Sequence, residues 1–154
     1  MKKISLFLII LIFVSHCGFK VIDMSEQNNF SIVNIETTGE SKINYIIKNN
    51  LLKSTKKEIN KINIKLETKK IRNIKEKNIK NEITKYEILI IVNVVVIENK
   101  NNKQHNIVVR ATGDYNVAEQ NSTTRNNEKQ LIKLLANSLS DKILNKINST
   151  LNDN

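Results

Sequence analysis

Cys17 is the only cysteine in the 154-residue chain, and it lies just after an apolar N-terminal stretch. Lys2 and Lys3 precede that stretch, which runs from Ile4 to Val14. A basic start, a short apolar run and then a cysteine are typical of a bacterial lipoprotein export signal, which is removed so that the acylated cysteine begins the mature chain. We therefore expect residues 1–16 to be a signal peptide and Cys17 to carry the lipid.

The apolar run is too short to be read as a transmembrane helix. Ile4 to Val14 covers eleven residues, whereas a spanning helix needs about 20. An uncleaved anchor is the alternative, because lipoprotein signals usually carry a small Gly or Ala before the cysteine and this chain has His16.

With no second cysteine, the exported part of the chain can form no internal disulfide. Burial and hydrogen bonding must then hold it together. Residues 17–154 are enough for one core and too few for two. The chain has no proline and only three glycines, so no linker divides it. We predict one lipid-anchored periplasmic domain over residues 17–154.

The charge of the chain favours anionic partners. The formal net charge of +10 falls to +8 once Lys2 and Lys3 are removed with the signal. Such a charge attracts nucleic acid, anionic lipid headgroups or phosphorylated glycolipid. The export signal argues against nucleic acid.

The first half of the domain alternates between strand and helix patterns. Phe30 to Thr37 reads as a strand that ends near Gly39. Ser41 is a suitable N-cap for a helix with one apolar stripe, which consists of Ile43, Ile46, Ile47 and Leu51. From Ile62 the apolar period becomes two, as in a strand with one solvated face. The stretch from Lys69 to Lys85 reads as the rest of this strand and a basic connection.

The second half predicts a hairpin and a long helix. Tyr86 to Ile97 is apolar on both faces, so we expect a central strand, paired with a strand over Ile107 to Val117. A helix of about 25 residues, or about 37 Å, should follow Ser122-Thr123-Thr124, with Glu128 in its first turn. The resulting order β-α-β-β-β-α predicts an α+β fold, with two helices packed on one face of a four-stranded, mostly antiparallel sheet.

Catalytic motifs are missing from the sequence. The chain has no HExxH, GxSxG or phosphate-binding glycine loop. His105 stands in a polar run and is expected to be a solvated imidazole. We therefore expect no enzyme, no cofactor and no metal site; a membrane-anchored enzyme is a remote alternative.

Several segments together resemble the lipopolysaccharide-assembly lipoproteins of the LptE family. They are Cys17-Gly18-Phe19, a strand followed by a helix, the long strand led by Tyr86, and the stretch Tyr115…Ser122-Thr123…Asn127-Glu128 that opens the final helix. The resemblance spans nearly the whole chain and rests on the order and spacing of these segments.

The resemblance implies a Gram-negative envelope protein at the periplasmic face of the outer membrane. Members of that family plug the β-barrel LptD, help deliver lipopolysaccharide to the cell surface and bind lipopolysaccharide through basic residues at one end of the sheet. Arg125 matches one such position, and Lys77 and Lys80 are the cations nearest to the other. The resemblance thus implies an LptD-like β-barrel, lipopolysaccharide and, through acylated Cys17, outer-membrane lipid as partners.

Charge chemistry agrees with this assignment, because an arginine can meet a phosphate with two parallel hydrogen bonds. Arg125, Lys77 and Lys80 are therefore a predicted phosphate-binding patch. The alternative is a lipid-anchored structural or interaction protein of the envelope with no glycolipid role, whose charge favours anionic membrane surfaces.

Overall fold

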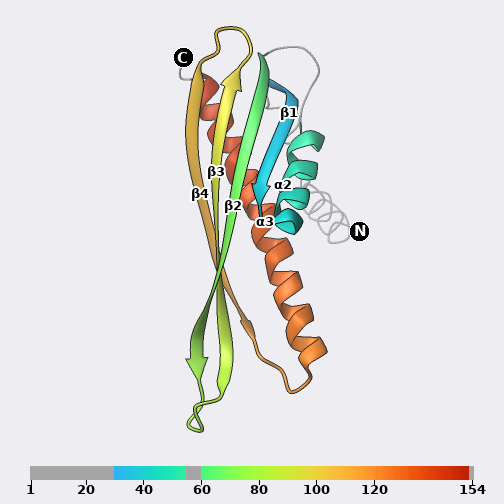
Figure 1. Ribbon diagram of the computed structural model, residues 1–154, viewed down its shortest axis with the longest axis vertical. Helices are drawn as coiled ribbons and strands as arrows, with labels where there is room; N and C mark the ends of the chain where they lie inside the picture. Colours follow the sequence, from blue (N-terminus) through green and yellow to red (C-terminus); the bar gives the residue numbers. More distant parts are fainter. Residues whose placement is uncertain (1–29, 55–59, 153–154) are drawn as a thin grey trace, which may run out of the picture.

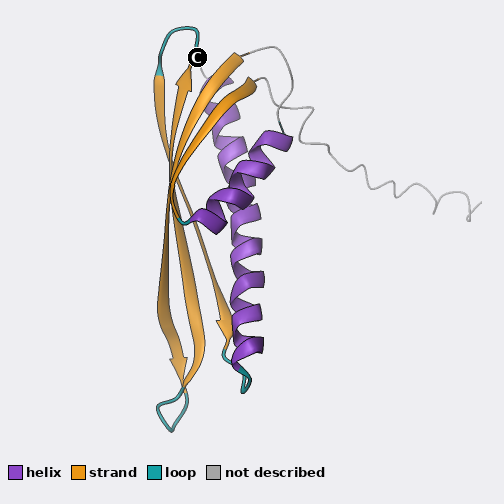
Figure 2. Cartoon of the chain, turned by 45° about the vertical axis from the view of Figure 1, so that its right-hand side comes forward, coloured by secondary structure: helices purple, strands orange, loops and turns teal. Residues whose placement is uncertain are grey.

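The computed structural model describes residues 30–54 and 60–152. The elements follow in the order β1 (Phe30–Gly39), α2 (Ser41–Lys53), β2 (Asn60–Lys77), β3 (Ile83–Glu98), β4 (Gln104–Asn116) and α3 (Asn121–Asn152) (Figure 1). Both helices lie on one face of a four-stranded sheet (Figure 2). The predicted α+β fold and its element order are confirmed.

The sheet has the strand order β1-β2-β3-β4. β1 runs parallel to β2, and the other two pairs are antiparallel. β1 pairs with β2 only from Asn60 to Thr68, so the second half of β2 is bonded to β3 alone. That half and the start of β3 form a hairpin that extends to the same end of the molecule as the start of α3 (Figure 1).

Alternation along the strands sends one set of side chains under the helices. Ile62, Ile64 and Leu66 of β2 are at most 2% exposed, whereas the intervening Lys65 and Glu67 are exposed. β3 and β4 bury every second residue in the same way. The helices cover this face with Ile43, Ile47, Leu51, Leu135, Leu139, Ile143 and Ile147. The predicted apolar stripe of the first helix is therefore confirmed as core, with Ile46 partly buried against it.

A buried polar junction marks the point where β1 ends and α2 begins. The Asn44 amide donates to the Thr38 carbonyl at 2.9 Å, and the Thr68 hydroxyl donates to the Asn44 side-chain oxygen at 2.9 Å. The Glu40 backbone N–H donates to the same hydroxyl at 3.0 Å. Asn44 and Thr68 are nearly inaccessible to water, so these bonds offset the cost of burying them.

The ends of the helices differ from the predictions. Ser41 is the first residue of α2 and not its cap, because Glu40 occupies the cap position and its backbone N–H is bonded to Thr68. α3 begins at Asn121 and is 32 residues long, so it starts before the predicted Ser122-Thr123-Thr124 caps. Glu128 consequently lies beyond the first turn and faces the sheet.

The predicted signal peptide and Cys17 lie outside the described residues. Neither helix among residues 30–54 and 60–152 is long and apolar enough to cross a membrane.

Candidate functional site

The inward-facing side chains of β2 change from apolar to charged at the point where β1 ends and no longer pairs with β2. After Thr68, the residues of β2 that point toward the helices are Lys70 and Arg72. The Arg72 guanidinium lies 4.7 Å from the centre of the Tyr86 ring, which stacks on Tyr115 of β4 at 5.6 Å. At this end of the sheet, β2 therefore contributes polar and aromatic contacts beside the aliphatic core of β3.

Glu128 of α3 joins these groups. Its carboxylate lies 3.3 Å from the Lys70 ammonium and 3.8 Å from the Arg72 guanidinium, and it accepts a 3.3 Å hydrogen bond from the Tyr115 hydroxyl. Glu128 is only 20% exposed, so its charge is poorly solvated and needs these partners. The contacts fix the first turns of α3 on the sheet.

Two pKa values report this environment. Burial raises the pKa of Tyr115 above its ordinary value, and the neighbouring Glu128 carboxylate acts in the same direction. Interaction with the Tyr115 hydroxyl raises the pKa of Arg72. Both shifts keep the groups in the protonated forms that face Glu128.

A groove opens beside this network, between the start of α2, the first half of α3 and the edge of β2. It has a volume of about 450 Å³. Ile43, Ile46 and Ile132 supply apolar lining, and Lys70 and Glu128 reach it from the network. Its other charged residues are Glu40, Lys42, Arg125, Lys129 and Lys133. We call it the cationic groove.

Four cations of the cationic groove are available to a ligand. Lys42, Arg125, Lys129 and Lys133 are exposed, and none of them forms an ion pair or hydrogen bond through its side chain with another of the described residues. Cations around an apolar lining suit an anionic amphiphile, since phosphate or carboxylate can meet the ammonium and guanidinium groups while apolar parts lie on the isoleucines.

The predicted phosphate-binding residues do not share one cavity. Arg125 lines the cationic groove. Lys77 is the last residue of β2 and Lys80 lies in the turn that follows, so neither lines the groove. The Lys77 ammonium donates to the Asn81 side chain at 2.9 Å. The hairpin and the start of α3 do lie at the same end of the molecule (Figure 1).

Sequence reasoning missed three cations of the groove. Lys129 and Lys133 follow Arg125 at successive intervals of four residues, which places all three on one side of α3. That spacing is visible in the sequence, but charges spaced along a helix usually face solvent, so the spacing does not by itself indicate a groove. Lys42 comes from α2, and its proximity to α3 has no signal in the sequence.

His105 differs from its prediction. It lies inside β4, and its Nε2 atom is 2.7 Å from a carboxylate oxygen of Glu98 across the β3–β4 hairpin. It is therefore a half-buried hydrogen-bonding group and not a solvated turn residue. The hydrogen bond to His105 lowers the pKa of Glu98. In the parts of the chain that the structure describes, no three His, Cys, Asp or Glu side chains could hold a metal ion together.

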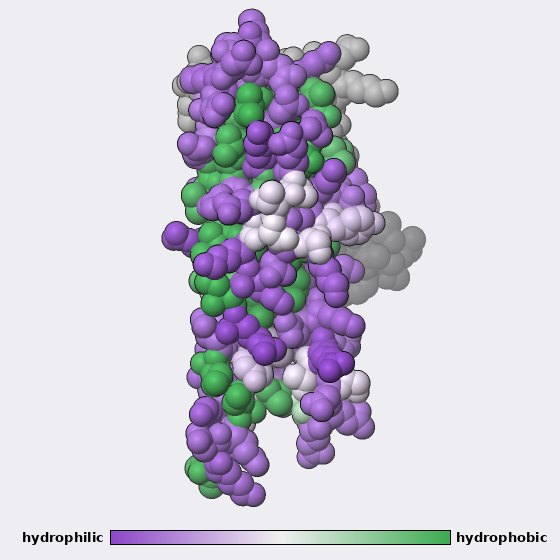
Figure 3. All heavy atoms as spheres, viewed as in Figure 1, coloured by the Kyte–Doolittle hydropathy of each residue, from purple (hydrophilic) through white to green (hydrophobic). Residues whose placement is uncertain are grey.

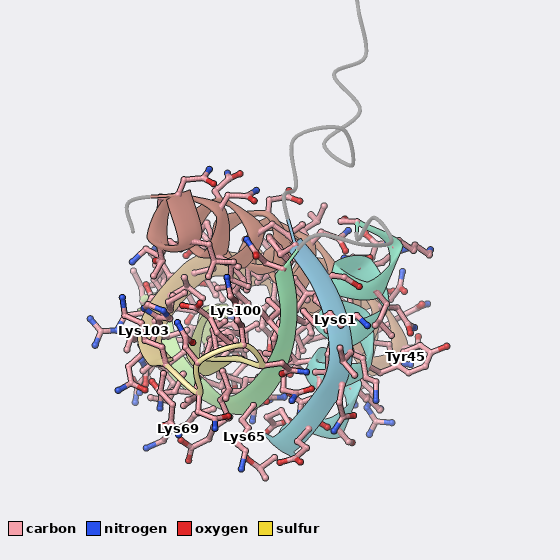
Figure 4. All side chains as sticks on the ribbon, turned by 90° about the horizontal axis from the view of Figure 1, so that it is seen from above. Tyr45, Lys61, Lys65, Lys69, Lys100 and Lys103 are labelled. Carbon is pink, nitrogen blue, oxygen red and sulfur yellow. The ribbon has the colours of Figure 1, made fainter. Side chains whose placement is uncertain are left out.

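Neither of the two described helices lies on the opposite face of the sheet (Figure 2). Apolar side chains gather between polar ones along this face in Figure 3. β3 supplies half-buried residues there, Leu89, Ile91, Val95 and Ile97, and lysines of β2 flank them. Lys65 and Lys69 point away from the helices in Figure 4.

No protein-family model and no curated protein matches the chain by sequence. The fold, however, is similar to solved lipoprotein structures. Rare lipoprotein B from Shewanella oneidensis matches with a TM-score of 0.62 at 15% identity, over 82% of this chain and 98% of that protein. A putative lipoprotein from Caulobacter crescentus matches with 0.58 at 15% identity, over 85% and 96%.

A third structure agrees with these two. Lipoprotein B from Nitrosomonas europaea matches with a TM-score of 0.60 at 13% identity, over 80% of this chain and 85% of that protein. At these identities the likeness concerns the fold. The chain therefore has the fold of lipoproteins of the rare lipoprotein B type.

Proposed function

We propose that the protein is a non-enzymatic outer-membrane lipoprotein that plugs an LptD-like β-barrel, helps to assemble it and assists the delivery of lipopolysaccharide to the cell surface. The lipoprotein part is supported by the Cys17 signal and by the lipoprotein fold. The glycolipid part is supported by the resemblance to the LptE family and by the charge of the cationic groove.

One observation carries the glycolipid role: four cations without partners among the described residues surround an apolar lining. Lipopolysaccharide has phosphates on its lipid A, which these cations can bind without any bond being made or broken. Arg125 belongs both to the lining of the groove and to the predicted phosphate-binding patch. Lys77 and Lys80 would act as a second contact on the hairpin.

Lipopolysaccharide capture by the detergent-extracted protein tests this role. Replacement of Arg125, Lys77 and Lys80 by alanine should lower the affinity by about tenfold or more, since hydrogen bonds between charged groups are each worth about 1.5–3 kcal/mol. The variant with alanine at Lys77 and Lys80 alone measures how much the hairpin contributes to the affinity, apart from Arg125 in the groove.

A control variant loses charge at the other end of the sheet. Lys100 and Lys103 belong to the turn between β3 and β4, and Figure 4 looks down on that end. Their replacement by alanine should change capture by less than about twofold, because exposed charges far from the ligand contribute little. Equal capture by the triple variant and the wild type would remove the phosphate-binding role.

The barrel role has a separate test. Extraction in mild detergent should recover the protein with an outer-membrane β-barrel in equal amounts. Recovery with a peptidoglycan-bound or inner-membrane protein would favour the structural envelope role instead.

A further inference from the structure

The lower half of β2 is a sheet edge with free hydrogen-bonding groups. β1 ends at Gly39, opposite Thr68, and no described strand pairs with the β1 side of β2 from Lys69 to Lys77. The pairing between β2 and β3 is regular as far as Ile74 and becomes irregular only after it. A regular run of strand with unpaired backbone groups is a template for another strand.

The hydrogen bonds at Thr68 identify which groups face this edge. The Thr68 carbonyl accepts a bond from the Glu40 N–H on the β1 side. Backbone groups alternate between the two edges of a strand, so the N–H and C=O groups of Lys70 and Arg72 face the same side as those of Thr68. Their side chains lie on the inner face, beside the cationic groove.

The other exposed edges of the sheet are covered differently. The Lys48 ammonium of α2 donates to the Ile35 carbonyl of β1 at 3.3 Å. On β4, Lys142 and Lys146 of α3 donate to the Arg110 and Val108 carbonyls at 3.1 and 3.3 Å. Within the described ranges, no side chain of this kind is bonded to the carbonyls of Lys70 or Arg72. Helix lysines therefore cover two edges and leave this one open.

The positive charge beside the open edge favours an acidic strand as its occupant. A strand placed beside Lys70 and Arg72 would direct alternate side chains into the cationic groove, toward Arg125 and Lys129. The remaining side chains would lie beside Lys69, whose ammonium has no partner among the described residues. A basic strand, including β2 of a second copy of this chain, would be repelled.

The existing sheet shows the same chemistry earlier in β2, where β1 still pairs with it. Glu36 of β1 lies beside Lys65 of β2, at 3.5 Å between carboxylate and ammonium. An acidic side chain on the neighbouring strand thus already pairs with a lysine of β2. At the open edge, Lys69 lies on the same face of β2 as Lys65 but has no acidic neighbour among the described residues.

We propose that the β2 edge at Lys70 and Arg72, together with the cationic groove, binds an extended acidic segment of a partner protein as an added β-strand. Backbone hydrogen bonds to Lys70 and Arg72 would hold the segment, and its carboxylates would face Arg125, Lys129 and Lys69. This site shares Arg125 and the cationic groove with the proposed glycolipid site, but it differs in requiring strand pairing and not only negative charge.

The probe is a heptapeptide, Thr-Glu-Val-Glu-Val-Glu-Thr, with a fluorophore on its N-terminus and an amidated C-terminus, added to the detergent-extracted full-length protein. Fluorescence anisotropy should show saturable binding, and hydrogen exchange should slow at the Lys70 and Arg72 amides while it stays unchanged at β4. The peptide with methylated backbone nitrogens keeps the charge but cannot pair, so it should bind about tenfold more weakly. The peptide with lysine in place of glutamate should not bind.

A pair of variants isolates the backbone donor. Arg72→Ala and Arg72→Pro lose the same charge, but only proline also removes the N–H that faces the edge, where proline is tolerated. Arg72→Pro should therefore bind the acidic peptide about tenfold more weakly than Arg72→Ala. If Arg72→Pro does not fold, the methylated peptide on the wild-type protein gives the same comparison.

Three results would overturn the proposal. Equal affinity for the acidic peptide and its methylated form would mean that the groove binds charge alone, as it would an anionic headgroup. If the hydrogen-exchange rate at Lys70 and Arg72 falls as the protein concentration rises, without peptide, the occupant would be a second copy of this chain. Binding that slows exchange only at β4 would place the site on the other edge.

Discussion

Tyr115 is the residue at which the sheet, α3 and the charged network meet. Because its pKa is raised by burial, the folded state holds the phenolic proton more tightly than the unfolded state does. The stability that this provides is fully present below the ordinary tyrosine pKa of about 10 and is lost as the pH rises through the folded pKa.

The variant Tyr115→Phe should therefore be less sensitive to alkali than the wild type. At pH 7 it should lose about 0.5–1.5 kcal/mol of unfolding free energy with the hydrogen bond to Glu128. Above about pH 10 the difference should shrink. Urea unfolding at a series of pH values measures this, and a difference that is constant up to pH 11 would contradict the prediction.

Glu128 should matter for stability because three groups depend on its charge. Glu128→Gln leaves Lys70 and Arg72 without a counter-charge and should lower the unfolding free energy by about 1–2 kcal/mol at low salt. Glu119→Gln, an exposed change of the same kind just before α3, is the control and should be near neutral. Thermal melting of both variants, with and without added salt, measures their losses of stability. Equal losses for Glu128→Gln and Glu119→Gln would show that the network contributes nothing to stability.

Single residues show where sequence reasoning reaches its limit. Arg125 was found by resemblance to a family motif, and the structure places it at a groove. Lys129 and Lys133 share its helix face, but charges on helices are usually solvated, so their spacing alone does not indicate a groove. What the sequence lacks is the distance between α2 and α3, which brings Lys42 to the same groove.

Among the elements, the turn from β1 into α2 depends on Gly39. Its φ of +90° is unfavourable for other residues, and an added Cβ would collide with the Thr68 backbone carbonyl. Gly39→Ala should therefore destabilise the protein by at least about 1–2 kcal/mol. Unfolding in urea, followed by circular dichroism, measures the loss.

Gly113 of β4 provides the matched comparison. A Cβ there would meet the Leu131 side chain at 2.8 Å, and the flexible end of a leucine can move. Gly113→Ala should cost clearly less than Gly39→Ala. Equal effects would mean that the backbone collision at Thr68 is not what makes Gly39 necessary.

The elements with apolar periodicity were predicted better than those without it. The two-residue period of β2 and β4 and the stripe of α2 follow directly from burial on one face, whereas β3 was predicted from its continuous apolar run. The start of α3 was placed too late because its first turns carry no apolar stripe: Glu128 contacts the sheet, and Thr124 bonds to Ala118 in the loop before the helix. The residue at which β2 ends was not predicted for the same reason. Lys70 and Arg72 occupy the inward positions that apolar residues hold earlier in the strand.

At the scale of the whole molecule, the lipid anchor is the prediction that decides where the protein acts. Mass spectrometry of the mature N-terminus should find Cys17 with a diacylglyceryl group and no residue before it. Cys17→Ala should release the protein from membranes, or leave it uncleaved, and an intact Met1 in the wild type would contradict the prediction.

The length of the β2–β3 hairpin sets a geometric limit on such an anchored molecule. From Cys17 to Phe30 the chain can reach at most about 45 Å even when fully extended. β2 begins opposite Phe30, and its 18 residues span about 55 Å at the usual rise. If the anchored molecule stands upright on its tether, the tip of the hairpin lies well clear of the leaflet that holds the lipid. A ligand of Lys77 and Lys80 would then have to come from the aqueous side or from a neighbouring protein.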